Sequence, residues 1–305
     1  MGTASWRTAI LVILKLAVSG TLLAYIFRKA GIGNIAGQLR TLDPRLFLSA
    51  SAVFIVIIFL SAVRWRVLLG GGQPLGRLFS LCLIGSFFNN LLPGAVGGDA
   101  VKTYYLYRET QEGGKSIAAV FMDRYVGYAG LLTIGLVSGI IAFRDLTPLG
   151  VQWLTPALFT AFLAGSLVVF GARIGRRFST VANFYDFFHD TLRDRRTMVR
   201  TYLLSLVIQV LNILSVYLIA RGLGQRPPFL ALFVFVPIVV TVMMIPISIS
   251  GLGLRESAFV VLFGLLGMPA EASTSISFLW FLSVAFGSLA GLVEYIRYRR
   301  TPAPA

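Results

Sequence analysis

Six apolar runs, each long enough to cross a lipid bilayer as a helix, constrain this chain more than any other feature of its sequence. A helix rises about 1.5 Å per residue, so about 20 apolar residues cover the ~30 Å hydrocarbon core of a bilayer. That core offers the backbone no hydrogen-bonding partner, and such segments therefore cross it as helices. The predicted spans are residues 8–27, 46–63, a run from about Ser116 whose uncharged part is 125–143, 146–172, 201–220 and 272–293. The second span ends at Arg64, Trp65 and Arg66, which predict an aromatic and basic anchor at the membrane interface.

The composition indicates the same class of protein. Of the 305 residues, 57% are hydrophobic and 13% are charged, whereas about 25% of the residues in a typical soluble domain are charged. We therefore expect an all-α polytopic membrane protein that forms a single integral membrane domain over residues 1–305. The only cysteine, Cys82, excludes an intrachain disulfide and a cysteine-based metal cluster. We expect neither a metal site nor a cofactor.

The formal net charge of +15 comes mainly from short segments between the apolar runs. Basic loops of this kind stay in the cytoplasm and contact anionic lipid head groups, so we expect membrane lipids and not nucleic acid as partners. The segment 173–200 is the most basic of these loops. Within it, Phe184, Phe188 and Leu192 recur at i, i+4 and i+8, and Tyr185 joins that face. This pattern predicts an amphipathic helix along the cytoplasmic interface.

Two further apolar stretches, residues 78–102 and 227–256, are interrupted by proline and glycine. Proline cannot continue a helix, and glycine allows backbone shapes that other residues resist. Irregular backbone at membrane depth is tolerated only where protein or a water-filled cavity satisfies its polar groups. We therefore expect two re-entrant or broken helices that line a polar cavity, with a full crossing as the alternative. The predicted hinge residues are Pro93, Gly94, Gly97, Gly98, Pro246, Gly251 and Gly253.

The two broken stretches share a layout, which predicts an internal repeat. Each combines an apolar run, a proline, small residues and an acid–base pair, Asp99 with Lys102 and Arg255 with Glu256. The repeat units are residues 46–143 and 201–293.

The distribution of basic residues predicts how these units are oriented. With both termini in the cytoplasm, seventeen basic residues fall on the cytoplasmic side and eight on the outer side, which follows the positive-inside rule. The first hairpin then enters from the cytoplasm and the second from outside, so the repeat is inverted. Paired discontinuous segments in inverted halves are the usual layout of alternating-access transporters. We expect the protein in the plasma membrane, which is the inner membrane in a bacterium.

Three motifs follow one another in the chain: FNNLLPGAVGGDAVKTYYLYR at 88–108, MDRYVG at 122–127 and PISISGLGLRESAF at 246–259. Together they resemble the flippase-like transmembrane family, which includes the membrane region of lysylphosphatidylglycerol synthase and its stand-alone relatives. The resemblance covers nearly the whole chain. It implies movement of a lipid between leaflets, such as an aminoacylated phospholipid or a lipid-linked sugar carrier. No soluble aminoacyl-transfer domain follows the last span in this sequence, so we do not expect synthase activity.

The resemblance makes Asp99 and Arg255 the principal candidate residues, with Arg255 binding a phosphate through its two-pronged guanidinium. The alternative for Asp99 is an ordinary acid at the positive end of a helix. Asp123 and Arg124 are explained equally well by a salt bridge that locks a conformation and by substrate contact. Asn89 and Asn90 could satisfy the broken backbone or bind a head group. The full set of predicted substrate-binding residues is Asn89, Asn90, Asp99, Lys102, Asp123, Arg124, Arg255 and Glu256.

These observations favour a lipid transporter for a phospholipid or a polyprenyl-phosphate-linked lipid. Two alternatives stay open at this point. One is an intramembrane enzyme that uses Asp99, Asp123 and Glu256 as acids, bases or metal ligands, although the chain carries no recognisable catalytic motif. The other is a membrane partner of a glycosyltransferase or another lipid-modifying enzyme.

Overall fold

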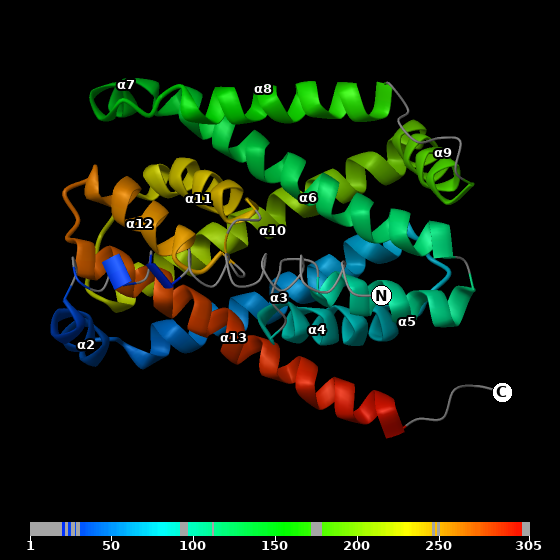
Figure 1. Cartoon of the computed structure of the whole chain (residues 1–305), viewed down its shortest axis with the longest axis horizontal. Helices are drawn as coiled ribbons and strands as arrows, with labels where there is room; N and C mark the ends of the chain where they lie inside the picture. Colours follow the sequence, from blue (N-terminus) through cyan, green and yellow to red (C-terminus); the bar gives the residue numbers. More distant parts are fainter. Residues whose placement is uncertain are drawn as a thin grey trace, which may run out of the picture.

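The computed structural model describes residues 31–91, 97–111, 113–171, 179–245 and 251–300, together with Gly20, Thr21, Ala24, Tyr25, Arg28 and Ser248. Most of the predicted span at 8–27 lies outside these residues, as do Pro93, Gly94 and Pro246. Every regular element in the described ranges is helical (Figure 1). The elements are α2 (Ile32–Arg40), α3 (Pro44–Leu68), α4 (Leu75–Leu91), α5 (Gly97–Thr110), α6 (Gly113–Ile141), α7 (Phe143–Leu146), η1 (Thr147–Leu149), α8 (Leu154–Ser166), η2 (Leu167–Gly171), α9 (Ser179–Arg193), α10 (Arg195–Gly222), α11 (Phe229–Met243), α12 (Leu254–Gly264) and α13 (Ala270–Arg300).

Five helices in the described residues are long and apolar enough to cross a membrane: α3, α6, α8 continued by η2, α10, and α13. They confirm five of the six predicted spans and the all-α polytopic class. Among them, α6 begins at Gly113, close to the start that the sequence predicts near Ser116. Asp123 and Arg124 consequently lie inside a continuous helix.

The centre of the molecule is an antiparallel pair formed by α3 and α10. At one end of the pair, the backbone N–H of Asp43, which caps α3, donates to the carbonyl of Gly222 at 2.9 Å. At the other end, Nη1 of Arg64 donates to Oγ of Ser205 at 2.8 Å. These two contacts define an Asp43 end and an Arg64 end of the molecule.

The helices α4 and α5 form a hairpin that starts from the Arg64 end and returns to it. α4 follows the end of α3, and α5 leads back to the start of α6. The first half of α6 lies beside the end of α3, since Arg64 Nε donates to Oδ1 of Asp123 at 2.8 Å. α4 extends through Asn89 and Asn90 to Leu91, so its helix is longer than the apolar run predicts.

The helices α11 and α12 form a second hairpin at the Asp43 end. α11 follows the end of α10, and α12 leads to the start of α13. In Figure 1, α4 and α5 lie toward the right side of the molecule and α11 and α12 toward the left. α13 then runs back to the Arg64 end, where Glu294 accepts a hydrogen bond from Ser80 of α4 at 2.8 Å.

Each hairpin packs against the long helix that follows the other hairpin. α4 packs on α13, and α11 packs on α6. α3 also packs on α13, as α10 does on α6. If α3, α4, α5 and α6 are paired in order with α10, α11, α12 and α13, each of these packing contacts therefore has a counterpart in the other group.

The predicted amphipathic helix is confirmed as α9, whose buried side packs on α6. Tyr185 and Phe188 are buried, and Phe188 stacks on Phe170 with ring centroids 3.7 Å apart. Leu192 was predicted on the same face but is exposed. The side chain of Phe184 lies outside the described residues. Part of the apolar face therefore contacts protein, and the position of this helix along the cytoplasmic interface stays a prediction.

Candidate functional site

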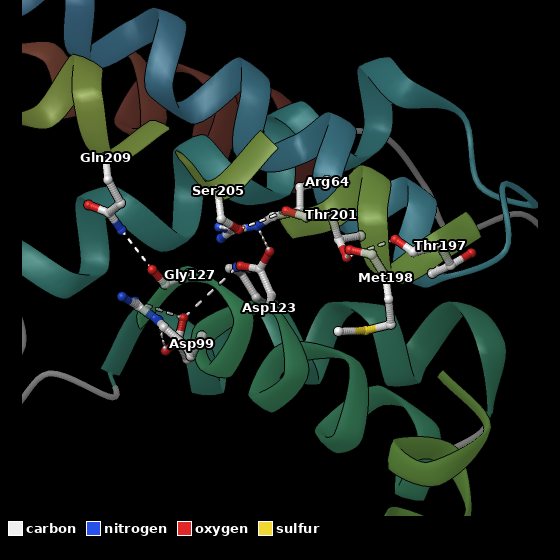
Figure 2. Close-up of polar contacts among 11 residues, drawn as sticks. Arg64, Asp99, Asp123, Gly127, Thr197, Met198, Thr201, Ser205 and Gln209 are labelled. Carbon is white, nitrogen blue, oxygen red and sulfur yellow. Dashed lines mark hydrogen bonds and ion pairs between the residues drawn. The ribbon is translucent and has the colours of Figure 1, made fainter. Parts of the chain in front are cut away.

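A buried cluster of charges joins the α4–α5 hairpin to the central helices (Figure 2). Its centre is Asp123 on α6, whose Oδ1 accepts a hydrogen bond from Arg64 Nε on α3 at 2.8 Å. Ser205 on α10 accepts a second hydrogen bond from the same guanidinium. The residues Arg64 and Asp123 are only 5% and 4% exposed. The buried guanidinium of Arg64 thus connects three helices, through an ion pair to α6 and a hydrogen bond to α10.

The cluster continues onto α5 through Lys102 and Asp99. Nζ of Lys102 lies 3.9 Å from Oδ2 of Asp123 and 3.9 Å from Oδ1 of Asp99. It also lies 4.7 Å from the centre of the Trp65 ring. Arg124 on α6 holds Asp99 with two hydrogen bonds, from Nε at 2.8 Å and from Nη2 at 3.1 Å. We call Arg64, Asp99, Lys102, Asp123 and Arg124 the first charge cluster.

The second charge cluster consists of Arg255 and Glu256 on α12 with Ser277 on α13. Nε of Arg255 donates to Oε1 of Glu256 and to Oγ of Ser277, both at 3.0 Å. The guanidinium lies 4.9 Å from the centre of the Phe281 ring. Both charged side chains are almost fully buried, at 4% and 5% exposed. In this conformation the Arg255 guanidinium, which the sequence predicts to bind a phosphate, therefore donates its hydrogen bonds to Glu256 and Ser277.

Glu256 also has a structural role at the start of α12. Its Oε2 accepts a hydrogen bond from the backbone N–H of Gly253 at 2.8 Å, which satisfies one of the free donors at that helix end. Gly253 has a φ of 82°, and Gly251 has a φ of 76°. Glycine adopts this left-handed region readily and other residues resist it, so the chain can turn into α12 at these two positions.

Asn89 and Asn90 both have partners within the protein. Oδ1 of Asn89 accepts from the backbone N–H of Gly98 at 2.8 Å, across the α4–α5 hairpin. Nδ2 of Asn90 donates to Oγ of Ser288 on α13 at 3.1 Å. These contacts correspond to the structural interpretation of the pair, in which the asparagines satisfy backbone and hold helices together.

The structure brings four of the predicted residues together in the first cluster: Asp99, Lys102, Asp123 and Arg124. For Asp123 and Arg124, the structure shows the partners that a conformation-locking salt bridge requires. Both residues form ion pairs with other segments and not with each other. Asp99 and Arg255 belong to different clusters: α5 packs on α4 and α6, whereas α12 packs on α11 and α13. That the two side chains face a common cavity stays a prediction.

Sequence reasoning missed Arg64, Ser205 and Ser277. The sequence predicts an interface anchor at Arg64, Trp65 and Arg66, and this is wrong for the first two, which are 5% and 0% exposed. Only Arg66 of the three is exposed. One signal was available: a buried acid such as Asp123 requires a basic partner, and Arg64 ends a neighbouring span.

A groove of about 710 Å³ lies between α5 and α6, beside the first cluster. Asp99 and Arg124 contribute to its wall, and the rest is mainly apolar and aromatic, including Tyr104, Tyr107 and Phe121. The side chain of Arg124 is 56% exposed, whereas that of Asp99 is 12% exposed. Arg124 is therefore the member of the cluster that a molecule in this groove would meet first.

Known proteins resemble this chain along most of its length. The family model described as the lysylphosphatidylglycerol synthase TM region matches residues 12–291. A UPF0104 membrane protein of Methanothermobacter thermautotrophicus is 25% identical over 96% of this chain and 93% of that protein. The UPF0104 membrane protein PH1989 of Pyrococcus horikoshii is 24% identical over 87% and 90%, and MJ1595 of Methanocaldococcus jannaschii is 22% identical over 94% and 95%.

Proposed function

The chain belongs to the family of the lysylphosphatidylglycerol synthase TM region, and from that premise we propose that it moves an anionic lipid between the two leaflets of a membrane. The lipid class is a phospholipid or a polyprenyl-phosphate-linked lipid. In this proposal the charged head group crosses next to the buried charge clusters, while the hydrocarbon tails stay in the bilayer.

One observation carries the proposal: the first charge cluster joins a hairpin that starts and ends at the Arg64 end of the molecule to the long helix α6. Charged side chains inside a membrane protein are costly and usually serve a function. Here Asp99 and Lys102 on α5 meet Asp123 and Arg124 on α6, next to the groove between those helices. A polar path beside an apolar groove suits a molecule with a charged head and a hydrocarbon tail.

The arrangement of the two hairpins supports an inverted repeat, and with it alternating access. α4–α5 starts from the Arg64 end and α11–α12 from the Asp43 end, and the packing contacts of α3–α6 have counterparts in those of α10–α13. Transporters with inverted repeats place the substrate site at discontinuous helices and rock one half against the other. In our proposal, the Arg64 end is cytoplasmic, because the basic residues of α9 and of the start of α10 lie there.

An intramembrane enzyme has less support. Asp99, Asp123 and Glu256 each form an ion pair with a basic side chain of the protein. In the part of the chain that the structure describes, no three histidine, cysteine, aspartate or glutamate side chains gather where they could hold a metal ion. Among the contacts of the described residues, none favours catalysis over binding.

Leaflet-specific transport in liposomes tests the proposal. The purified protein is reconstituted with a fluorescent phosphatidylglycerol in one set of vesicles and a fluorescent polyprenyl phosphate in another, and an impermeant quencher reports the fraction in the outer leaflet. We expect the protein to speed redistribution of at least one lipid above the rate in protein-free vesicles. Equal rates with and without protein for both lipids would overturn the proposed function.

A matched pair of variants links transport to the second cluster. Glu256→Gln keeps the side-chain size and the acceptor for Gly253 but removes the charge that pairs with Arg255. Glu271→Gln makes the same chemical change in the first turn of α13. We expect at least a tenfold slower redistribution for Glu256→Gln only, which corresponds to about 1.4 kcal/mol at the rate-limiting barrier. Equal rates for both variants would remove this cluster from the mechanism.

A further inference from the structure

The first charge cluster carries one more positive than negative charge. Its ion pairs join three basic side chains, Arg64, Lys102 and Arg124, to two carboxylates, Asp99 and Asp123. An excess positive charge attracts an anion that can come close to it. The second cluster pairs Arg255 with Glu256 and is neutral. The first cluster is therefore the one that calls for a bound anion.

Arg124 is the residue through which an anion reaches this charge. Its Nε and Nη2 are bound to Asp99, but its side chain is 56% exposed and lines the groove. The remaining guanidinium edge offers further N–H donors in the planar geometry that suits a phosphate. Arg64, by contrast, is buried and already bonded to Asp123 and Ser205.

Arg124 lies about one helical turn inward from the end of a neighbouring span. The spanning segment made by α8 and η2 ends at Gly171, and Phe170 next to that end contacts Phe121. Arg124 lies three residues beyond Phe121 on α6, which is about 5 Å along the helix axis. Tyr104 and Tyr107 line the same groove, and aromatic side chains with a polar tip concentrate at the membrane interface. The groove therefore lies near the end of the spans, where the long arginine side chain can extend toward the phosphates of one leaflet.

We propose that the groove between α5 and α6 binds one anionic phospholipid from the leaflet at the Arg64 end, with its phosphate on Arg124. The exposed apolar side chains of Ile117 and Phe121 beside the groove contact the acyl chains. The bound phosphate balances the excess charge of the first cluster. The choice of a lipid rests on the proposed function, and the groove is the place where that lipid is taken up from one side.

Binding of a short-chain phosphatidylglycerol to the purified full-length protein in a neutral detergent tests this site. Affinity is measured from the rise in thermal unfolding temperature as the lipid is added, with phosphatidylcholine, inorganic phosphate and a polyprenyl phosphate as separate arms. We expect phosphatidylglycerol to bind and Arg124→Gln to weaken it at least about tenfold, since the variant loses a charged hydrogen-bond donor. Arg124→Lys keeps the charge without the planar geometry and is expected to restore part of the affinity.

Arg200→Gln is the matched control, because it removes one exposed positive charge from the same end of the molecule. We expect it to bind as the unmodified protein does. Without lipid, Arg124→Gln must unfold at the same temperature as the unmodified protein, which separates lost binding from lost structure. If it unfolds at a lower temperature, a second measurement replaces it. Tyr104→Cys is then introduced in a Cys82→Ala background, and we measure whether the lipid protects this cysteine from a thiol reagent. Full protection of that cysteine supports the site, and its absence contradicts it.

Three results would overturn the site: equal affinity of Arg124→Gln and the unmodified protein, equal binding of phosphatidylcholine, or binding of the polyprenyl phosphate alone. If inorganic phosphate saturated the groove at the same concentration as the lipid, the groove would be a simple anion site, and this result would likewise contradict a lipid-binding site. The outcomes separate from those of the proposed function. Binding without movement in liposomes overturns the function and keeps the site, whereas movement with Arg124 irrelevant to binding overturns the site alone.

Discussion

Arg64 connects three elements through one guanidinium, which makes it the residue with the largest expected effect on stability. It is buried, it bonds to Asp123 on α6, and it bonds to Ser205 on α10. When one partner of a buried ion pair is removed, the other charge is left without compensation. The loss of stability on removing one partner exceeds the net contribution of the ion pair, because the remaining charge is still desolvated in the folded protein and no longer has a partner.

We predict that Arg64→Met lowers the free energy of unfolding by about 3–5 kcal/mol, measured by thermal unfolding in detergent. Arg66→Met is the control, since Arg66 is exposed and bonds only to the carbonyl of Gln73 at 3.1 Å among the contacts of the described residues. It should change stability by less than about 0.5 kcal/mol. The double variant Arg64→Met with Asp123→Asn should cost less than the two single changes together. Similar losses for Arg64→Met and Arg66→Met would contradict the buried pair.

Asp194 caps the start of α10 and gives a pH-dependent contribution outside the membrane spans. Its Oδ1 accepts from the backbone N–H groups of Arg196 and Thr197. Hydrogen bonds from Thr197, more than any other cause, hold the pKa of Asp194 below its ordinary value. A depressed folded-state pKa means that the cap stabilises the protein above the unfolded-state pKa, about 3.9, and that this contribution is lost as the pH falls through the folded value.

We predict that Asp194→Asn, which retains a good capping side chain, flattens the acid limb of the thermal stability profile below about pH 4. The change should be small, because the residue is exposed. Asp145→Asn, another exposed aspartate, serves as the comparison and should keep the profile of the unmodified protein. An unchanged profile for Asp194→Asn would show that the cap does not titrate in this way.

At the scale of elements, the α4–α5 hairpin depends on a close approach at Gly98. A Cβ at this position would overlap the carbonyl oxygen of Gly85 on α4 and press on the side chain of Asn89. Backbone atoms of a neighbouring helix cannot move aside as a flexible side chain does. The two limbs could not keep their present separation with any larger residue at Gly98.

We therefore predict that Gly98→Ala destabilises the protein by at least about 1–3 kcal/mol, measured as a lower unfolding temperature. Gly76→Ala is the matched control in α4, because a Cβ there would meet nothing within 4 Å. Alanine is favoured over glycine in a helix by roughly 1 kcal/mol, so the control should be neutral or slightly more stable. If Gly98→Ala behaved like Gly76→Ala, the limbs would have to be farther apart than described.

The elements also show how far the sequence can be interpreted. Span length and hydropathy are local properties, and they predicted α3, α6, α8, α10 and α13 correctly. The position of Arg64 was not local information: its partner Asp123 lies 59 residues away, and an arginine at the end of a span fits equally well as a lipid-facing anchor. For the same reason, the apolar face of α9 was predicted but its contact with α6 was not, since periodicity does not distinguish a protein partner from a bilayer.

At the scale of the whole molecule, the two clusters are unequal in exposure. Arg124 is half exposed in its groove, while Arg255 is 4% exposed between α12 and α13. If the two groups of helices alternate as proposed, this structure would be the state in which Arg124 is the accessible arginine. In the opposite state, α12 and α13 would separate and expose Arg255, which is the condition under which the predicted phosphate contact of Arg255 would form.

In the proposed inverted arrangement, the two hairpins enter the membrane from opposite sides. Single cysteines in a Cys82→Ala background test it, with Arg108→Cys in the last turn of α5 and Gly264→Cys at the end of α12, both exposed positions. An impermeant thiol reagent is applied to intact cells and to permeabilised cells. We predict that intact cells label only Gly264→Cys and that permeabilised cells label both variants. Labelling of both cysteines, or only of Arg108→Cys, in intact cells would contradict the account.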